Sequence, residues 1–131
     1  MMVATSPCEP LGFGLMTECF RRNPTTDLRT PRSTFDTFCR SVLTEQPVTL
    51  WPTVHPELRY MMQKRIQVEG NEKFFGRMKQ IIANPGGRLC LGEPQVVEPG
   101  KMKCSVLRGR RQVATASFDF HDRSWVLSSL Q

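Results

Sequence analysis

The sequence predicts a protein of the α+β class, with helices in the middle of the chain and an antiparallel sheet in its last third. Two observations lead to this prediction. Apolar residues recur at helical spacing in residues 33–46 and again in residues 71–83. From residue 88 onward, apolar and polar residues alternate instead, in four segments that are separated by hairpin-sized gaps. Consecutive strands joined by such short gaps pair antiparallel.

The length and composition fit one globular domain. The chain has 131 residues, of which 39% are hydrophobic and 23% are charged. No apolar run approaches the roughly 20 residues that cross a bilayer. The N-terminal stretch lacks the basic and apolar regions of a secretory signal. We therefore expect a cytoplasmic protein that does not associate with membranes.

Residues 1–32 hold four prolines and are expected to form an N-terminal arm, which either supplies a first helix or is partly disordered. A domain of residues 33–131 follows. Its first helix is expected to start at Ser33, whose hydroxyl precedes Asp36 by three residues, as in a capping box, and to end before Pro47. The apolar face of this helix consists of Phe35, Phe38, Cys39, Val42 and Leu43.

The segment 47–68 contains three prolines, and Ile66 and Val68 alternate with polar residues near its end. We expect a short helix or turn here, followed by one or two short strands. Gly70 then interrupts the chain and Asn71 caps a second helix. The apolar face of that helix consists of Phe74, Phe75, Met78, Ile81 and Ile82, and the run Asn84-Pro85-Gly86-Gly87 ends it.

Four strands are expected to complete the fold. Their ranges are 88–98, 101–108, 111–120 and 123–130. In the third of these, alternation places small and aromatic residues on one face and mixed, mostly polar residues on the other. The first face holds Ala114, Ala116, Phe118 and Phe120, and the second holds Val113, Thr115, Ser117 and Asp119.

Two short motifs and the order of the elements resemble a known superfamily. The motifs are Val68-Glu69-Gly70-Asn71-Glu72-Lys73-Phe74-Phe75 and Phe118-Asp119-Phe120-His121-Asp122-Arg123-Ser124-Trp125-Val126. Over residues 33–131 the chain resembles the NTF2-like superfamily, and its SnoaL-like members in particular. Arg123 or Ser124 stands where these members usually carry glycine. The resemblance implies a cone, in which a curved antiparallel sheet of about four to six strands wraps around two or three helices.

In such a cone, the inner sheet face and the helices would line a ligand pocket. The face that we assign to the pocket carries no acid, which suits an apolar ligand or core packing better than acid–base chemistry. The side chains expected to line the pocket are Phe38, Trp51, Phe74, Met78, Met102, Ala116, Phe118, Phe120 and Trp125. If the protein is an enzyme, the candidate catalytic residues are His55, Asp36 and Tyr60.

The chain is basic, with 18 Lys and Arg residues against 12 Asp and Glu residues. Arginine-rich surfaces suit phosphate or carboxylate partners, although a solvated hairpin is the more ordinary explanation for such a cluster. The densest group lies in residues 101–111 and contains Lys101, Lys103, Arg108, Arg110 and Arg111 without an acid.

The five cysteines are odd in number, and no two of them have the short spacing of a zinc knuckle. The two histidines, His55 and His121, are distant in sequence, and neither is beside a cysteine. We therefore expect free thiols, a reducing compartment, no metal and no cofactor.

These observations favour a non-catalytic NTF2-like module that binds a partner protein or an apolar small ligand, as a homodimer formed through the outer sheet face. One alternative is a small SnoaL-like isomerase, dehydratase or cyclase with acid–base chemistry in the cone. A second alternative is an RNA- or phosphate-binding protein that uses residues 101–111 together with Arg59, Lys64 and Arg65. Nucleic acid is the less favoured partner, because the basic hairpin lacks interleaved aromatic residues for base stacking.

Overall fold

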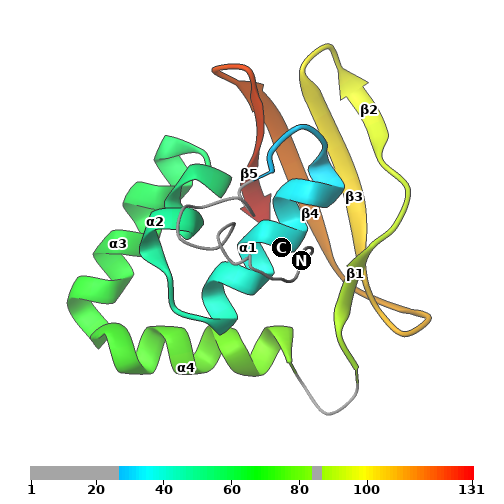
Figure 1. Cartoon of the computed structure of the whole chain (residues 1–131). Coiled ribbons are helices and arrows are strands. Elements are labelled where there is room, and N and C mark those ends of the chain that lie inside the picture. Colours follow the sequence, from blue (N-terminus) through cyan, green and yellow to red (C-terminus); the bar gives the residue numbers. More distant parts are fainter. Residues whose placement is uncertain (1–26, 84–86) are drawn as a thin grey trace, which may run out of the picture.

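The computed structural model describes residues 27–83 and 87–131, and the predictions made for residues 1–26 lie outside these ranges. The described residues form an α+β fold in which helices pack on a curled antiparallel sheet (Figure 1). The helices are α1 (Pro31–Leu43), α2 (Pro47–Leu50), α3 (Pro56–Glu69) and α4 (Asn71–Ile82), with a short 3-10 helix, η2 (Trp51–Thr53). The strands are β1 (Leu89–Leu91), β2 (Gln95–Glu98), β3 (Lys101–Arg108), β4 (Arg111–His121) and β5 (Ser124–Leu130).

The sheet has five strands in the order β1-β3-β4-β5, and β2 also pairs with β3. The antiparallel meander of β3, β4 and β5 confirms the prediction for the last third of the chain. The segment 88–98, expected as one strand, is instead two short strands that share one edge of β3. The Gly92 N–H still donates to the Ser105 carbonyl at 2.8 Å, and the chain then leaves the ladder at Glu93-Pro94, where Pro94 has no N–H to donate.

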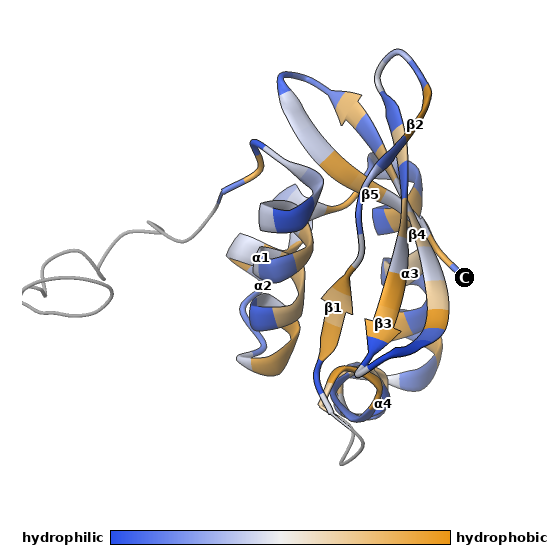
Figure 2. Cartoon of the chain, turned by 90° about the vertical axis from the view of Figure 1, so that its right-hand side faces the viewer, coloured by the Kyte–Doolittle hydropathy of each residue, from blue (hydrophilic) through white to orange (hydrophobic). Residues whose placement is uncertain are grey.

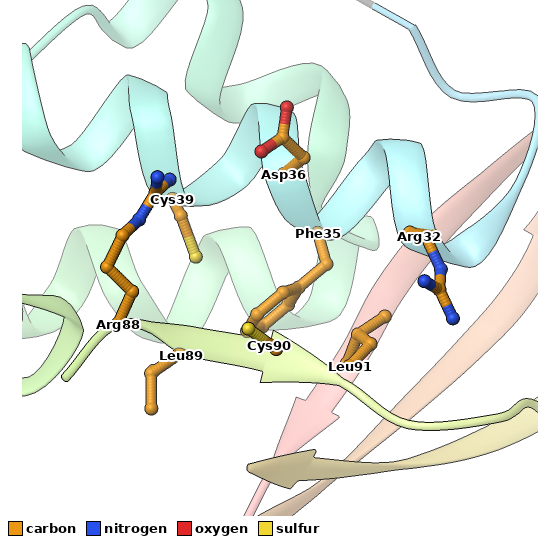
Figure 3. A pocket seen from close by; sticks show the side chains of 8 residues that line it. All are labelled: Arg32, Phe35, Asp36, Cys39, Arg88, Leu89, Cys90 and Leu91. Atoms are coloured by element: carbon orange, nitrogen blue, oxygen red, sulfur yellow. The ribbon is translucent and has the colours of Figure 1, made fainter. Parts of the chain in front are cut away.

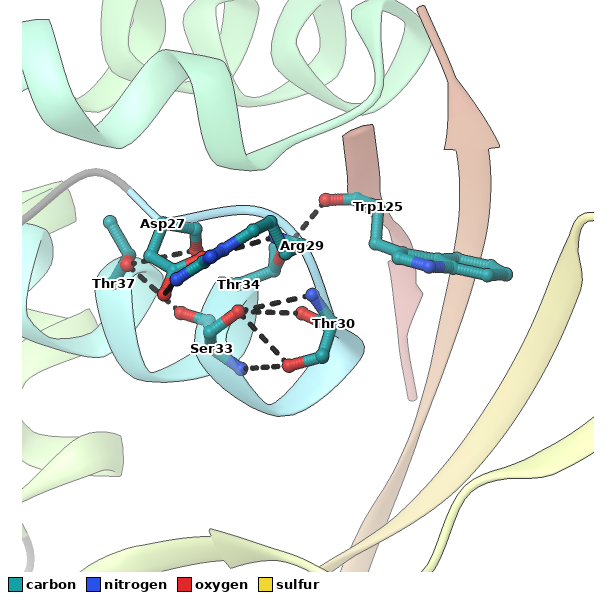
Figure 4. Close-up of polar contacts among 7 residues, drawn as sticks. All are labelled: Asp27, Arg29, Thr30, Ser33, Thr34, Thr37 and Trp125. Carbon is teal, nitrogen blue, oxygen red and sulfur yellow. Dashed lines mark hydrogen bonds and ion pairs between the residues drawn. The ribbon is translucent and has the colours of Figure 1, made fainter. Parts of the chain in front are cut away.

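Helix α1 begins earlier than the sequence pattern suggests. Thr30, not Ser33, is the N-cap, and Pro31 occupies the first helical position, where its missing N–H costs nothing. Thr30 and Ser33 form the capping box. The Ser33 N–H donates to Thr30 Oγ1 at 3.0 Å and the Thr30 N–H donates to Ser33 Oγ at 3.1 Å (Figure 4). Asp36 therefore lies beyond the first turn, and it forms an ion pair with Arg40 at 3.0 Å.

Residues 56–69 form helix α3, so the prediction of short strands here is wrong. His55 is the N-cap, and its Nδ1 accepts a hydrogen bond from the Glu57 N–H at 3.1 Å. Helix α3 has one buried residue, Met62, so its sequence shows no apolar stripe at helical spacing. The apparent alternation of Ile66 and Val68 does not reflect burial either, because Val68 is 83% exposed. The described residues consequently form four α-helices, which exceeds the upper end of the expected two or three by one.

Helix α4 follows α3 after a single glycine. Gly70 is the N-cap of α4 with a φ of +93°, which favours glycine, and the expected Asn71 cap is instead the first helical residue. Figure 2 shows α4 end-on at the lower end of the sheet, with α1 and α2 to one side. The helices thus enclose one face of the sheet and one of its ends.

The core lies between the helices and the inner face of the sheet. Cys104 and Val106 on β3 are buried, and the burial of Ala116 and Phe118 on β4 confirms the alternation predicted for those two positions. Phe120 departs from it, because it is 52% exposed and packs against the Trp125 ring instead. The largest fully buried apolar side chains are Phe38, Phe118, Leu50, Leu127, Val42 and Val106.

The outer edge of β5 is covered by backbone and side-chain contacts. The Trp125 N–H donates to the Leu28 carbonyl at 2.9 Å. In Figure 4, Thr34 Oγ1 donates to the Trp125 carbonyl at 2.7 Å. The His55 N–H donates to the Leu127 carbonyl at 2.8 Å. The folded domain therefore includes residues before the expected boundary at residue 33.

Candidate functional site

An open pocket of about 300 Å³ lies between helix α1 and strand β1 (Figure 3). Helix α1 supplies side chains at positions i, i+3, i+4 and i+7, which share one face of a helix. Strand β1 and the residue before it supply four consecutive positions. The lining residues are Arg32, Phe35, Asp36, Cys39, Arg88, Leu89, Cys90 and Leu91.

The floor of this pocket is apolar. Phe35 is 3% exposed and Leu91 is 9% exposed, and both belong to the core cluster. Leu89 packs against the same cluster while remaining half-buried. The pocket is therefore a hollow in the edge of the core rather than a polar surface groove.

The charged lining residues differ in whether they have an ion-pair partner. Asp36 pairs with Arg40, so an arginine outside the pocket neutralises its carboxylate. Arg32 and Arg88 are exposed, and neither has an ion-pair or hydrogen-bond partner in the described part of the chain. The pocket consequently carries a net positive charge.

Two cysteines line the pocket in different states. Burial, reinforced by the nearby Asp36 carboxylate, raises the pKa of the Cys39 thiol to about 12, although Arg88 acts in the opposite direction. Cys39 is therefore a protonated, apolar wall residue at neutral pH. Cys90 is an exposed free thiol, and Cys104, deeper in the sheet, is buried and free. The expectation of a reducing compartment stays a prediction.

The Cys39 pKa predicts a loss of stability at alkaline pH. The unfolded thiol ionises around its ordinary pKa of 9.0, whereas the folded thiol keeps its proton up to a pKa of about 12. Because the unfolded state releases this proton first, rising pH favours unfolding above pH 9. Between pH 8 and 10 this group should remove roughly 1 kcal/mol of the free energy of unfolding. Urea unfolding at both pH values should show a larger loss in the wild type than in Cys39→Ala, which keeps the contribution of the buried Cys104 thiol, whose pKa is also raised by burial. An equal pH dependence in the two proteins would contradict the assignment.

The three catalytic candidates do not form one site. Asp36 lines the α1–β1 pocket, and His55 and Tyr60 are not among its lining residues. Tyr60 is 62% exposed on α3, where the Lys64 Nζ lies 5.3 Å from its ring centroid. His55 occupies its Nδ1 in capping α3.

The structure brings the two histidines together, which the sequence does not indicate. The ring centroids of His55 and His121 are 5.2 Å apart, and the ring planes are inclined by 56°. Within residues 27–83 and 87–131, however, no three His, Cys, Asp or Glu side chains are grouped so that they could hold a metal ion.

The apolar residues expected to line a pocket are placed elsewhere. Phe38, Phe74, Ala116 and Phe118 are at most 4% exposed and form the core itself. Trp51, Met78 and Trp125 pack against that core, Met102 is half-buried and Phe120 is exposed. None of these side chains lines the α1–β1 pocket. The residues that do so escape sequence reasoning, although the spacing of Arg32, Phe35, Asp36 and Cys39 is a signal for one helix face.

The basic cluster of residues 101–111 is partly engaged within the molecule. Lys101 pairs with Asp119 at 3.5 Å. Arg108 donates to the carbonyls of Ile81 and Gly87, which ties β3 to the end of α4. Lys103, Arg110 and Arg111 have no such partner in the described residues. The positive electrostatic potential of the cluster is therefore weaker than its sequence suggests.

No helix within the described ranges is long and apolar enough to cross a membrane. Comparisons with protein-family models, with curated proteins and with solved structures find no match to this chain. The resemblance to the NTF2-like superfamily therefore stays a prediction, and a function has to be argued from the pocket itself.

Proposed function

We propose that this protein is a binding module that holds a small, largely apolar ligand in the α1–β1 pocket. The observation that carries the proposal is the cavity of about 300 Å³ with a floor of core side chains. Small-molecule sites occupy roughly 300–1,000 Å³ and are lined mainly by apolar groups. At roughly 30 Å³ for each water displaced, the cavity matches a ligand of about ten non-hydrogen atoms.

The lining chemistry supports binding rather than catalysis. General acid–base catalysis requires a group that exchanges protons near neutral pH. The buried thiol in the wall, Cys39, keeps its proton because its pKa is raised to about 12. The one carboxylate in the wall, Asp36, is exposed and held by Arg40. The sequence-based predictions of a partner protein and of a homodimer stay predictions.

Octan-1-ol, a ligand of suitable size, should bind in the pocket and shield Cys90, which is exposed in its wall. Because alkylation follows the unoccupied fraction, iodoacetamide should modify Cys90 about tenfold more slowly when the pocket is about 90% occupied. Peptide mapping by mass spectrometry would measure the modification of Cys90 separately from that of the other cysteines. Backbone NMR shifts should concentrate in α1 and β1.

A pair of tryptophan variants provides the control. Cys90→Trp fills the pocket and should abolish the NMR shifts caused by octan-1-ol. Val97→Trp adds the same side chain at a 58% exposed position of β2 and should leave them unchanged. Shifts scattered over the surface, or shifts that survive in Cys90→Trp, would rule out the pocket as the binding site.

A further inference from the structure

Two arginines flank the pocket from opposite walls. Arg32 extends from α1 toward β1 near Leu91, and Arg88 extends from the β1 side toward α1 near Cys39 (Figure 3). The apolar floor lies between them. A ligand on that floor would therefore have a guanidinium group within reach at either end.

Neither of these two guanidinium groups has a partner in the described domain, as is also true of Lys103, Arg110 and Arg111, but Arg32 and Arg88 are the cations that line the pocket. Arg40, Arg65, Arg77, Lys79 and Lys101 each pair with a carboxylate. Arg32 and Arg88 have no ion pair or hydrogen bond within residues 27–83 and 87–131, and Asp36, the acid in the pocket lining, is paired with Arg40. Their hydrogen-bond donors remain available to a ligand.

The position of Arg32 adds to the positive potential. It lies in the first turn of α1, a turn that contains no acid. The N-terminal end of a helix favours negative charge and disfavours a cation. An anion beside Arg32 would relieve both the unpaired guanidinium and the unfavourable placement of its charge.

We infer that the ligand is an amphipathic carboxylate, whose head binds Arg32 or Arg88 and whose apolar body covers Phe35, Leu89 and Leu91. The inference rests on the proposed function and specifies its ligand class. The planar guanidinium fork matches a carboxylate through two parallel hydrogen bonds. Octanoate, with about ten non-hydrogen atoms, matches the size that the cavity sets.

Calorimetric titration of the full chain with four probes tests the inference. Octanoate should bind more tightly than octan-1-ol, which has the same tail without the charge, and more tightly than acetate, which has the head without the tail. Inorganic phosphate should bind weakly, because it cannot use the apolar floor. Tight binding of phosphate would overturn the amphipathic assignment.

Three charge variants locate the head group. Arg32→Gln or Arg88→Gln should weaken octanoate binding by about tenfold to a hundredfold, the range for a lost charge-assisted hydrogen bond. Octan-1-ol binding should not change. Arg110→Gln removes the same charge at the exposed β3–β4 turn and should leave octanoate binding unchanged.

The outcomes separate the two proposals. One contrary result is that octanoate and octan-1-ol bind equally well and that neither Arg32→Gln nor Arg88→Gln changes the affinity. This result would overturn the carboxylate assignment but would leave the proposal of a binding module intact. If Arg110→Gln weakens octanoate binding as much as Arg32→Gln or Arg88→Gln does, the cause is general charge attraction. That result would also overturn the carboxylate assignment. If neither octanoate nor octan-1-ol binds, both proposals fail.

Discussion

Replacing Phe118 with alanine is expected to lower the free energy of unfolding by about 3–5 kcal/mol, as for other buried phenylalanines. Phe118 is 0% exposed at the centre of the sheet, where it lies opposite Met102 of β3 and Leu127 of β5. Deleting its ring removes apolar contacts and leaves a cavity that the neighbouring strands cannot close. Urea unfolding followed by circular dichroism would measure the loss.

Phe120→Ala is the matched control on the same strand. Phe120 is 52% exposed, and its described ring contact is with Trp125, at a centroid distance of 5.3 Å. Its truncation should cost about 1 kcal/mol or less, mainly the value of one aromatic pair. Equal losses in the two variants would mean that Phe120 is buried in solution, contrary to the structure.

Phe118 and Phe120 also show what the alternation of apolar and polar residues predicts about burial and what it does not. The sequence pattern assigns Phe118 and Phe120 to one face of the strand, but it cannot say where that face stops being covered. The bounds of β3 agree with the predicted range 101–108, because glycines with positive φ define both ends. Gly100 and Gly109 have φ values of +81° and +66°. Where backbone geometry demands glycine, the sequence carries a local signal.

Helix α3 was not predictable from periodicity because periodicity reports burial. A helix that buries Met62 and leaves Tyr60, Met61 and Val68 exposed has no apolar stripe. Its ends were nonetheless marked in the sequence. Pro56 fits the first helical position and Gly70 follows the last, so these boundary signals outweigh the short alternation at Ile66 and Val68.

The candidate site was less predictable than the fold, because its two walls come from distant parts of the chain. The helix-face spacing from Arg32 to Cys39 indicates which side chains point the same way, but it does not reveal what faces them. The opposite wall is β1, a strand of three residues whose pairing with β3 depends on the whole sheet. Arg88 precedes that strand and carries no motif of its own.

The second large effect is expected at α2. Leu50→Ala should lower the free energy of unfolding by about 2–5 kcal/mol, although this helix has only four residues. Leu50 is 0% exposed and belongs to the same core cluster as Phe38 and Val42 of α1. Alanine is the best helix former, so the substitution removes packing without weakening the local helix. Chemical denaturation with an unchanged m-value would show that stability alone has changed.

Val48→Ala provides the comparison within the same turn. Val48 is 69% exposed, and its truncation should change the free energy of unfolding by about 0.5 kcal/mol or less. Because both variants place alanine in α2, two residues apart, a large difference between them assigns the loss to the contact of α2 with α1. A similar loss in both variants would instead make helix formation in this turn the source of stability. The first result would establish that residues 47–50 anchor the helical layer against which the pocket-forming helix α1 is held.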